Sequence, residues 1–297
     1  MSNAMEWLQF VLAPQMINGL SIGVAVVLMA LGLTIIFGLL DVINMAHGEF
    51  YAIGAYLAVA LLATGMSFWW ALVLTPLLMA VLGFVTERGL IQRVFHSKDR
   101  HTLTLLLTFG VAVVLEDALK IAFGANPLRL AAPISGATEM LGLFFPNYRL
   151  FVMLFGGALI AAVWLLVFRT SLGAIVRAAA YDRNMSASLG VPVQLVYAGT
   201  FAFGVALAGI AGVLLAPIYS VFPTMGKDFV LIAFSVVIIG GMGSIKGALL
   251  AGLLLTQVQS ISSLYISPVW SDPLLFGIMV LVLMWRPQGL FGKLGSA

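Results

Sequence analysis

Long apolar segments alternate with short polar ones along the whole chain. A helix that spans a bilayer needs about 20 mainly apolar residues. By that measure the sequence predicts eight membrane-spanning helices, at residues 14–39, 47–64, 68–90, 102–123, 149–168, 195–217, 247–265 and 271–285. A further apolar segment, 229–241, is shorter, and is either a short crossing or part of a re-entrant segment buried in protein. We expect an all-α polytopic membrane helical bundle with eight or nine spans, forming a single domain over residues 1–297.

The composition excludes a soluble globular enzyme. Of the 297 residues, 62% are hydrophobic and 8% are charged, whereas soluble domains have about 25% charged residues. So few charged side chains cannot cover a globular surface, and the apolar excess is expected to face lipid. The chain contains no cysteine, which excludes disulfide frameworks and cysteine-ligated metal sites.

Basic residues are distributed unequally between the loops. Ten of the 14 lie in a first group of regions, namely 86–101, 169–194, Lys246 and the C-terminal tail. The other four lie at the opposite ends of the predicted spans, at Lys120, Arg129, Arg149 and Lys227. Because cytoplasmic loops carry an excess of Lys and Arg, this pattern places the C-terminus in the cytoplasm. The N-terminus then lies outside if 229–241 crosses completely.

A polar segment interrupts the first two apolar spans. It contains Asp41, Asn44, His47 and Glu49. One interpretation is helix capping, since Asn44 precedes a predicted helix and Glu49 falls in its first turn. The second is that these side chains form part of the translocation path. A metal site is not expected, because His47 and Glu49 have no third ligand nearby in the sequence.

Charged residues also lie inside the predicted span 102–123. Glu116 and Lys120 are four residues apart, so they share a helix face and can neutralise each other. Their closeness to the end of the span favours a structural pair near the outer interface over a proton relay.

Small residues recur at four-residue steps in the predicted span 195–217, at Gly204, Ala208, Gly212 and Ala216. This spacing lets a neighbouring helix approach closely. We expect it to serve internal packing of this subunit rather than a subunit interface.

The polar segment 169–194 predicts two short cytoplasmic helices. Thr170 or Ser171 can cap the first, and Asp182 can cap the second, which Gly190 would end. Two capped helices with small side chains form a compact surface for a partner protein, whereas a solvated loop would contain more Lys, Glu and Ser.

No catalytic apparatus is recognisable. The sequence lacks a G-x-x-x-x-G-K-[ST] phosphate loop, and its nearest approach, Gly240-Gly-Met-Gly-Ser-Ile-Lys-Gly, has Gly after the lysine. Neither G-x-S-x-G nor H-E-x-x-H occurs. We therefore expect no catalytic residue, no cofactor and no metal, and any energy from ATP has to come from a partner.

Two motifs resemble a known family. The run Gly38-Leu-Leu-Asp-Val-Ile-Asn-Met-Ala-His-Gly-Glu-Phe-Tyr-Ala-Ile-Gly-Ala-Tyr is similar to the signature of permeases in bacterial branched-chain amino acid ABC importers. The run Arg177-Ala-Ala-Ala-Tyr-Asp-Arg-Asn-Met-Ser-Ala-Ser-Leu-Gly resembles the coupling segment of that family. Gly240-Gly-Met-Gly-Ser and Arg286-Pro-Gln-Gly-Leu-Phe also fit, so the resemblance covers nearly the whole chain. Its compact length is similar to that of the shorter, H-type permease.

The resemblance implies the ABC importer permease fold and a multi-pass subunit in the bacterial inner membrane, surrounded by membrane lipid. It implies import of branched-chain amino acids together with a second permease subunit, two cytoplasmic ATPase subunits and a periplasmic substrate-binding protein, with no nucleic acid partner. It further implies that 173–190 transmits ATPase closure to the bundle. The residues expected in this coupling segment are Gly173, Arg177, Ala178, Asp182, Ala187 and Gly190.

Three alternative functions stay open at this point. The same kind of permease can import urea or short amides. A stand-alone secondary transporter or channel would work without an ATPase, although the lack of charges near mid-bilayer and the capped cytoplasmic segment argue against it. A membrane-embedded scaffold that moves no solute would have no need for the polar 41–49 segment.

Overall fold

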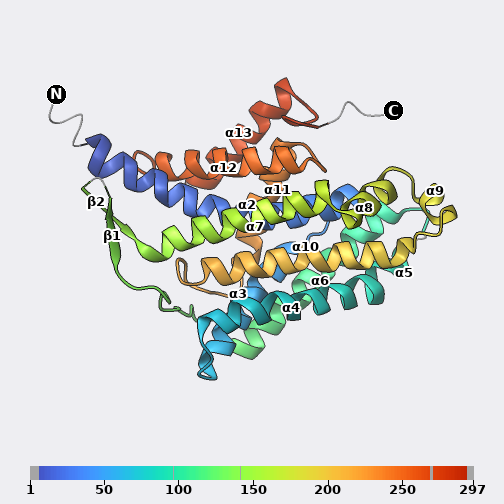
Figure 1. Ribbon diagram of the computed structural model, residues 1–297, viewed down its shortest axis with the longest axis horizontal. Coiled ribbons are helices and arrows are strands. Elements are labelled where there is room, and N and C mark those ends of the chain that lie inside the picture. The colour runs from blue at the N-terminus through green and yellow to red at the C-terminus, as the bar shows by residue number, and fades with distance from the viewer. Residues whose placement is uncertain (1–6, 96, 141, 268–269, 293–297) are drawn as a thin grey trace.

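Figure 1 shows the computed structural model of the protein, which describes residues 7–95, 97–140, 142–267 and 270–292. In chain order its helices are α2 (Ala13–Leu40), α3 (His47–Ala63), α4 (Phe68–Thr86), α5 (Gln92–Val94), α6 (Arg100–Phe123), α7 (Asn147–Arg169), α8 (Ser171–Tyr181), α9 (Arg183–Ser188), α10 (Val193–Leu215), α11 (Met225–Gly240), α12 (Ile245–Ser262) and α13 (Ser271–Trp285). A π-helical turn, Leu8–Leu12, directly precedes α2, and a second one, Glu87–Ile91, directly follows α4. The expected all-α bundle is confirmed, with one small sheet added.

The centre of the bundle is formed by α2 and α10. Both are apolar on all sides, which is typical of a helix that is surrounded by protein. The α2 helix packs against α7, α10, α11 and α12, and α10 packs against α2, α3 and α4. The α6 and α7 helices lie at the periphery and leave large apolar side chains exposed, such as Val114 and Leu154. Such exposed apolar faces are suited to contact with lipid.

Six helical segments are long and apolar enough to span a membrane, among the residues that the structure describes. They are Phe10–Leu40, Phe68–Val94, Arg100–Phe123, Asn147–Arg169, Val193–Leu215 and Ile245–Ser262. The predicted count of eight or nine is therefore not confirmed by length. Two further apolar helices, His47–Ala63 and Pro273–Trp285, are shorter, and α11 has 16 residues. The α3 helix is short because the polar junction before it is not helical.

Glycines let the central helices approach to backbone contact. A Cβ atom on Gly54 of α3 would lie 2.5 Å from the Cα atom of Gly209 in α10. Gly204 of α10 faces Gly32 of α2 in the same way, and Gly212 lies against the backbone of α3. The expectation that the small-residue stripe of α10 serves internal packing is confirmed.

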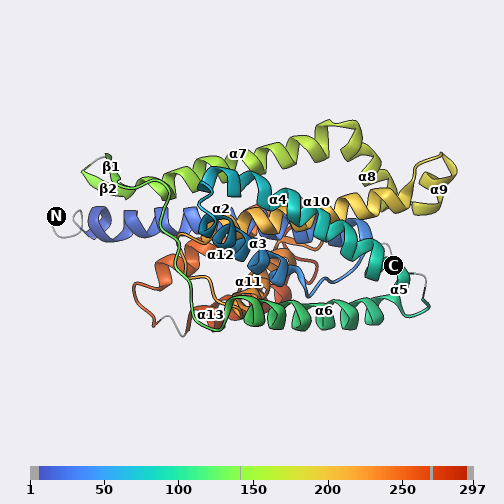
Figure 2. The same ribbon diagram turned by 90° about the horizontal axis from the view of Figure 1, so that it is seen from below.

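The two ends of the bundle differ. A two-stranded antiparallel hairpin, β1 (Ala137–Met140) and β2 (Leu143–Pro146), lies at the end near the N-terminus, together with the start of α7 (Figures 1 and 2). The opposite end carries α5, α8 and α9. We call this second end the basic end, because the segments rich in Lys and Arg gather there. The hairpin was not expected, although Gly142, with φ +76°, marks its turn.

Candidate functional site

The polar segment predicted between the first two spans forms a non-helical junction, residues 41–46, between α2 and α3. Asp41 ends α2 with φ +54°, the left-handed region that a non-glycine residue adopts at a cost. Its backbone N–H donates to the carbonyl of Phe37 at 2.8 Å. The hydroxyl of Thr108 in α6 lies 3.2 Å from both the Ile43 carbonyl and the Met45 N–H. The junction is therefore attached to α6 as well as to the two helices that it joins.

The predicted site residues of this segment occupy the junction and the first turn of α3. The Asn44 side chain accepts a hydrogen bond from the Ala46 N–H at 3.1 Å, so it stabilises the turn ahead of α3. The helix itself begins at His47 after Ala46, and no side chain of the residues that the structure describes caps it. His47 Nε2 lies 3.0 Å from the carbonyl of Met29 in α2. Asn44 therefore stabilises the turn that precedes α3 and does not cap the helix itself, because the chain makes an extra turn between Asn44 and the first helical residue.

Buried polar atoms without partners collect at this junction. Asn44, His47 and Glu49 are all fully or almost fully buried. One polar atom of each, Nδ2, Nδ1 and Oε2 respectively, has no hydrogen-bond partner among the described residues. The Glu49 carboxyl faces the start of α11, where a Cβ atom on Gly226 would lie 2.6 Å from it. Burying polar groups without partners is costly, and such groups inside a membrane protein are candidates for function.

A second charged cluster lies near the start of α11. Glu116 of α6 accepts ion pairs from Lys120 at 2.7 Å, as the sequence predicts, and from Lys227 of α11 at 2.6 Å. Lys120 also lies 3.2 Å from Asp117. The Lys227 contact was missed, because no local pattern relates residues this far apart in the chain. The cluster joins a peripheral helix to α11, the helix that faces Glu49.

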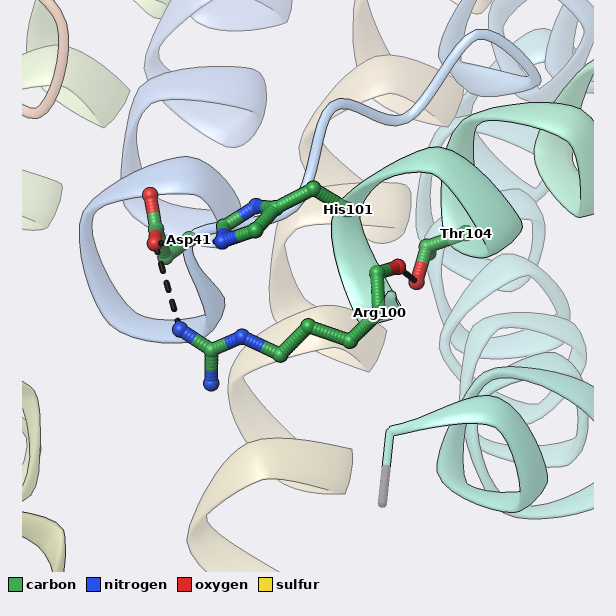
Figure 3. A network of polar contacts seen from close by, with 4 residues as sticks. All are labelled: Asp41, Arg100, His101 and Thr104. Carbon is green, nitrogen blue, oxygen red and sulfur yellow. Dashed lines mark hydrogen bonds and ion pairs between the residues drawn. The ribbon is translucent and has the colours of Figure 1, made fainter. Parts of the chain in front are cut away.

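At the basic end, Asp41 is held from α6 (Figure 3). Its carboxylate lies 3.3 Å from Arg100 Nη2 and 3.5 Å from His101 Nε2. The Thr104 hydroxyl donates to the carbonyl of Arg100 one turn earlier. The left-handed residue that ends α2 is thus tied to the first turn of α6.

The two short helices of the predicted coupling segment form with the predicted caps. The Thr170 hydroxyl accepts from the Gly173 N–H at 3.2 Å, and the Asp182 carboxylate accepts from the Met185 N–H at 2.9 Å. Gly190, with φ +86°, follows the end of α9. The segment therefore has the local structure that its sequence predicts.

Its predicted site residues differ in exposure. Gly173 is buried against the backbone of α7, where a Cβ atom would clash. Arg177 is exposed, donates to the carbonyl of Val167 and lies over the ring of Phe168. Ala178 and Ala187 are exposed. Only some of these residues therefore present a side chain to a partner.

Exposed apolar side chains on α8 and α9 were not singled out from the sequence. Tyr181 is 95% exposed and Leu189 is 75% exposed, and Leu172 and Met185 are also exposed. The signal was present as apolar residues in a segment too polar to span a membrane. We call these four exposed apolar residues of α8, α9 and the residue that follows α9 the α8–α9 surface.

The fold and these sites define a polytopic membrane protein with a polar junction inside its bundle and an apolar surface at its basic end. Residues 15–283 match the family described as the permease component of the branched-chain amino acid transport system. The chain belongs to this family. The resemblance read from its motifs is confirmed.

Curated relatives agree with this assignment. The chain is 31% identical over 294 residues to the high-affinity branched-chain amino acid transport system permease protein LivH of Salmonella typhimurium, covering 94% of this chain and 95% of LivH. It is 30% identical to BraD of Pseudomonas aeruginosa, with the same coverage. Against LivM of Escherichia coli it is 28% identical and covers 67% of that longer protein. The length of the chain thus agrees with the shorter, H-type permeases.

One solved structure has a similar fold. It is described as PsaBC from Streptococcus pneumoniae in complex with Fab, with a TM-score of 0.51 and 14% identity. The alignment covers 96% of this chain and 95% of that chain. At this identity the likeness concerns the fold alone.

Proposed function

We propose that the protein is the permease subunit of an ATP-driven importer of branched-chain amino acids in the bacterial inner membrane. The observation that carries this proposal is the family match over residues 15–283, together with relatives of almost equal length that are named for this transport. The complex contains a second permease subunit, two cytoplasmic ATPases and a periplasmic binding protein. The chain itself supplies no nucleotide site, so ATP is hydrolysed by the partner subunits.

Within the part of the chain that the structure describes, nine helices cross the membrane. They are the six long helices together with the shorter α3, α11 and α13. The junction before α3 supports this arrangement, because it meets α6 at Thr108, two turns or about 12 Å from Arg100 at the basic end. The α3 helix therefore starts inside the membrane layer and needs fewer residues to reach the far side. The basic end is cytoplasmic by its excess of Lys and Arg, and the N-terminus lies outside.

The ATPase binds the α8–α9 surface. Apolar side chains that lie outside the spanning helices and are exposed to water favour a protein partner. Tyr181 and Leu189 provide the apolar contact, and Ala187, which is exposed on α9, contributes a small side chain to the same surface. Gly173 and Asp182 set the shape of the surface, through backbone packing and helix capping respectively.

The translocation path passes the junction and the start of α11. Asn44, His47 and Glu49 bring to this place polar atoms that have no hydrogen-bond partner among the described residues. A transported amino acid carries an ammonium and a carboxylate group, and such polar atoms offer hydrogen bonds to both. Because α3 has no side-chain cap, this role is preferred to helix capping for Glu49.

Reconstituted uptake tests the proposed function. The purified permease pair with its ATPases and binding protein is placed in proteoliposomes, and uptake of radiolabelled leucine, isoleucine and valine is measured with ATP inside. We expect ATP-dependent uptake of all three and no nucleotide turnover by this chain alone. Uptake of urea or short amides in place of leucine would assign the other substrate class, and uptake without an ATPase would overturn the proposal.

A further inference from the structure

A continuous row of contacts leads from α9 to the junction. The Arg183 guanidinium in α9 lies over two aromatic rings, with its Cζ atom 4.9 Å from the ring centre of Phe95 and 5.4 Å from that of Tyr197. The two rings meet edge to face with their centres 5.5 Å apart. Both rings are buried. Arg183 therefore fixes α9 to the segment after α5 and to the start of α10.

The row continues through Arg100. Its Cζ atom lies 5.4 Å from the ring centre of Phe95, and its Nη2 atom lies 3.3 Å from the Asp41 carboxylate (Figure 3). The Phe95 ring thus contacts two guanidinium groups, one from α9 and one from the first turn of α6. Asp41, the first residue of the junction, ends α2 in the left-handed conformation.

We infer that Arg183, Phe95, Arg100 and Asp41 are positioning residues that carry movement of α9 to the junction. This inference rests on the proposed function, in which the ATPase binds α8 and α9. A guanidinium stacked on a ring has a defined orientation, so displacement of α9 displaces Phe95 and the start of α6. Asp41 and Thr108 then move the junction, because both attach it to α6.

The exposure of these groups argues for positioning rather than stability. Arg100 and Asp41 are partly exposed to solvent, and exposed ion pairs contribute little to stability. The left-handed φ of Asp41 costs free energy, so glycine would suit its backbone better. If Asp41 served stability alone, its replacement by glycine would therefore not lower the stability of the protein.

A spin label in the junction tests the linkage without any transport. The chain has no cysteine, so Ile43→Cys, at a site that is 43% exposed, accepts a single label. We expect Arg183→Ala, Arg100→Ala and Asp41→Gly each to increase the mobility of this label in the purified chain. Arg93→Ala removes an exposed arginine at the same end of the bundle and should leave the spectrum unchanged. A label at Met284→Cys, far along the chain on α13, should respond to none of the variants.

Coupling is then measured in the reconstituted complex. With Arg183→Ala we expect the ATPase to co-purify and hydrolyse ATP, while leucine uptake per ATP falls at least fivefold. Arg100→Ala should cause a similar fall, and the double variant should be no worse than either single variant, since both interrupt one row. Asp41→Gly should lose coupling while its thermal stability is kept or raised.

The outcomes separate this inference from the proposed function. Unchanged label mobility in Arg183→Ala, or a wild-type ratio of uptake to ATP hydrolysis, would overturn the inference. An equal fall of leucine uptake per ATP in the control variant Arg93→Ala would also overturn the inference. Absence of leucine uptake by the wild-type complex would overturn the proposed function, while the response of the label in the chain alone would still decide the linkage.

Discussion

Glu116 of α6 and Lys227 of α11 form an ion pair of 2.6 Å between elements far apart in the sequence. Glu116 is only 3% exposed and also contacts Lys120 at 2.7 Å. One carboxylate therefore contacts two lysines, and it attaches a peripheral helix to the start of α11. The pair lies on the same helix start that faces Glu49, so it fixes one wall of the candidate path.

Loss of this carboxylate should destabilise the protein. Glu116→Gln removes both charge-assisted contacts, and we expect a cost of about 1–3 kcal/mol, seen as a lower thermal unfolding temperature in detergent. Asp117→Asn is the matched control, because Asp117 is exposed and its carboxylate, within the described part of the chain, pairs with Lys120 alone. An equal loss in both variants would mean that burial of Glu116 and its contact with Lys227 do not matter.

Backbone contact between α3 and α10 should tolerate no side chain. In Gly54→Ala the new Cβ atom would meet backbone atoms of Gly209 at 2.5–2.6 Å. Backbone cannot move aside as a side chain can, so we expect a loss of at least about 1–3 kcal/mol and a reduced folded yield. In Gly110→Ala on α6 the new Cβ atom meets no atom of the described residues within 4 Å, so this variant should be neutral or stabilising. Equal thermal stability of the two variants would contradict this packing.

The positions of long helices are predicted well from the sequence, whereas contacts between parts of the chain that are far apart in sequence are not. The predicted spans agree with α2, α6, α7 and α10, because a bilayer demands a long apolar run. The predicted span 47–64 also agrees with α3, which begins at His47. The buried contacts of His47 with α2 and of the junction with α6 are what no local pattern contains. Local caps such as Asp182 were predictable, since a cap and its partner N–H are three residues apart.

The contacts of Arg183 show most clearly what could not be predicted from the sequence. From the sequence, this arginine belongs to a basic segment that is predicted to be cytoplasmic and that resembles the coupling segment of the family, with no contact predicted for it inside the chain. In the structure its charge lies over the rings of Phe95 and Tyr197, which come from two other parts of the chain. Aromatic residues next to membrane ends are common, so their presence carries no information about which cation they contact.

Glu49 should act in transport rather than in folding. Glu49→Gln keeps the shape of the side chain, and the Glu49 Oε2 atom has no hydrogen-bond partner among the described residues. We expect a folded yield close to that of the wild type and leucine uptake reduced at least tenfold, with the ATPase still bound. Glu87→Gln is the matched control, since Glu87 is also buried with a carboxyl oxygen that has no such partner. A similar loss of uptake in Glu87→Gln would trace the effect to buried carboxylates in general.

Labelling of single cysteines should establish both the orientation and the ATPase contact. Ala187→Cys on α9 and Ala137→Cys on β1 are matched, since both replace an exposed alanine and lie at opposite ends of the bundle. An impermeant maleimide should react with Ala187→Cys only from the cytoplasmic side and with Ala137→Cys only from outside. Binding of the ATPase should slow the first reaction several-fold and leave the second unchanged, because only α9 lies on the α8–α9 surface. Reaction of Ala187→Cys from outside would invert the topology, and a rate that the ATPase does not change would remove α9 from the docking site.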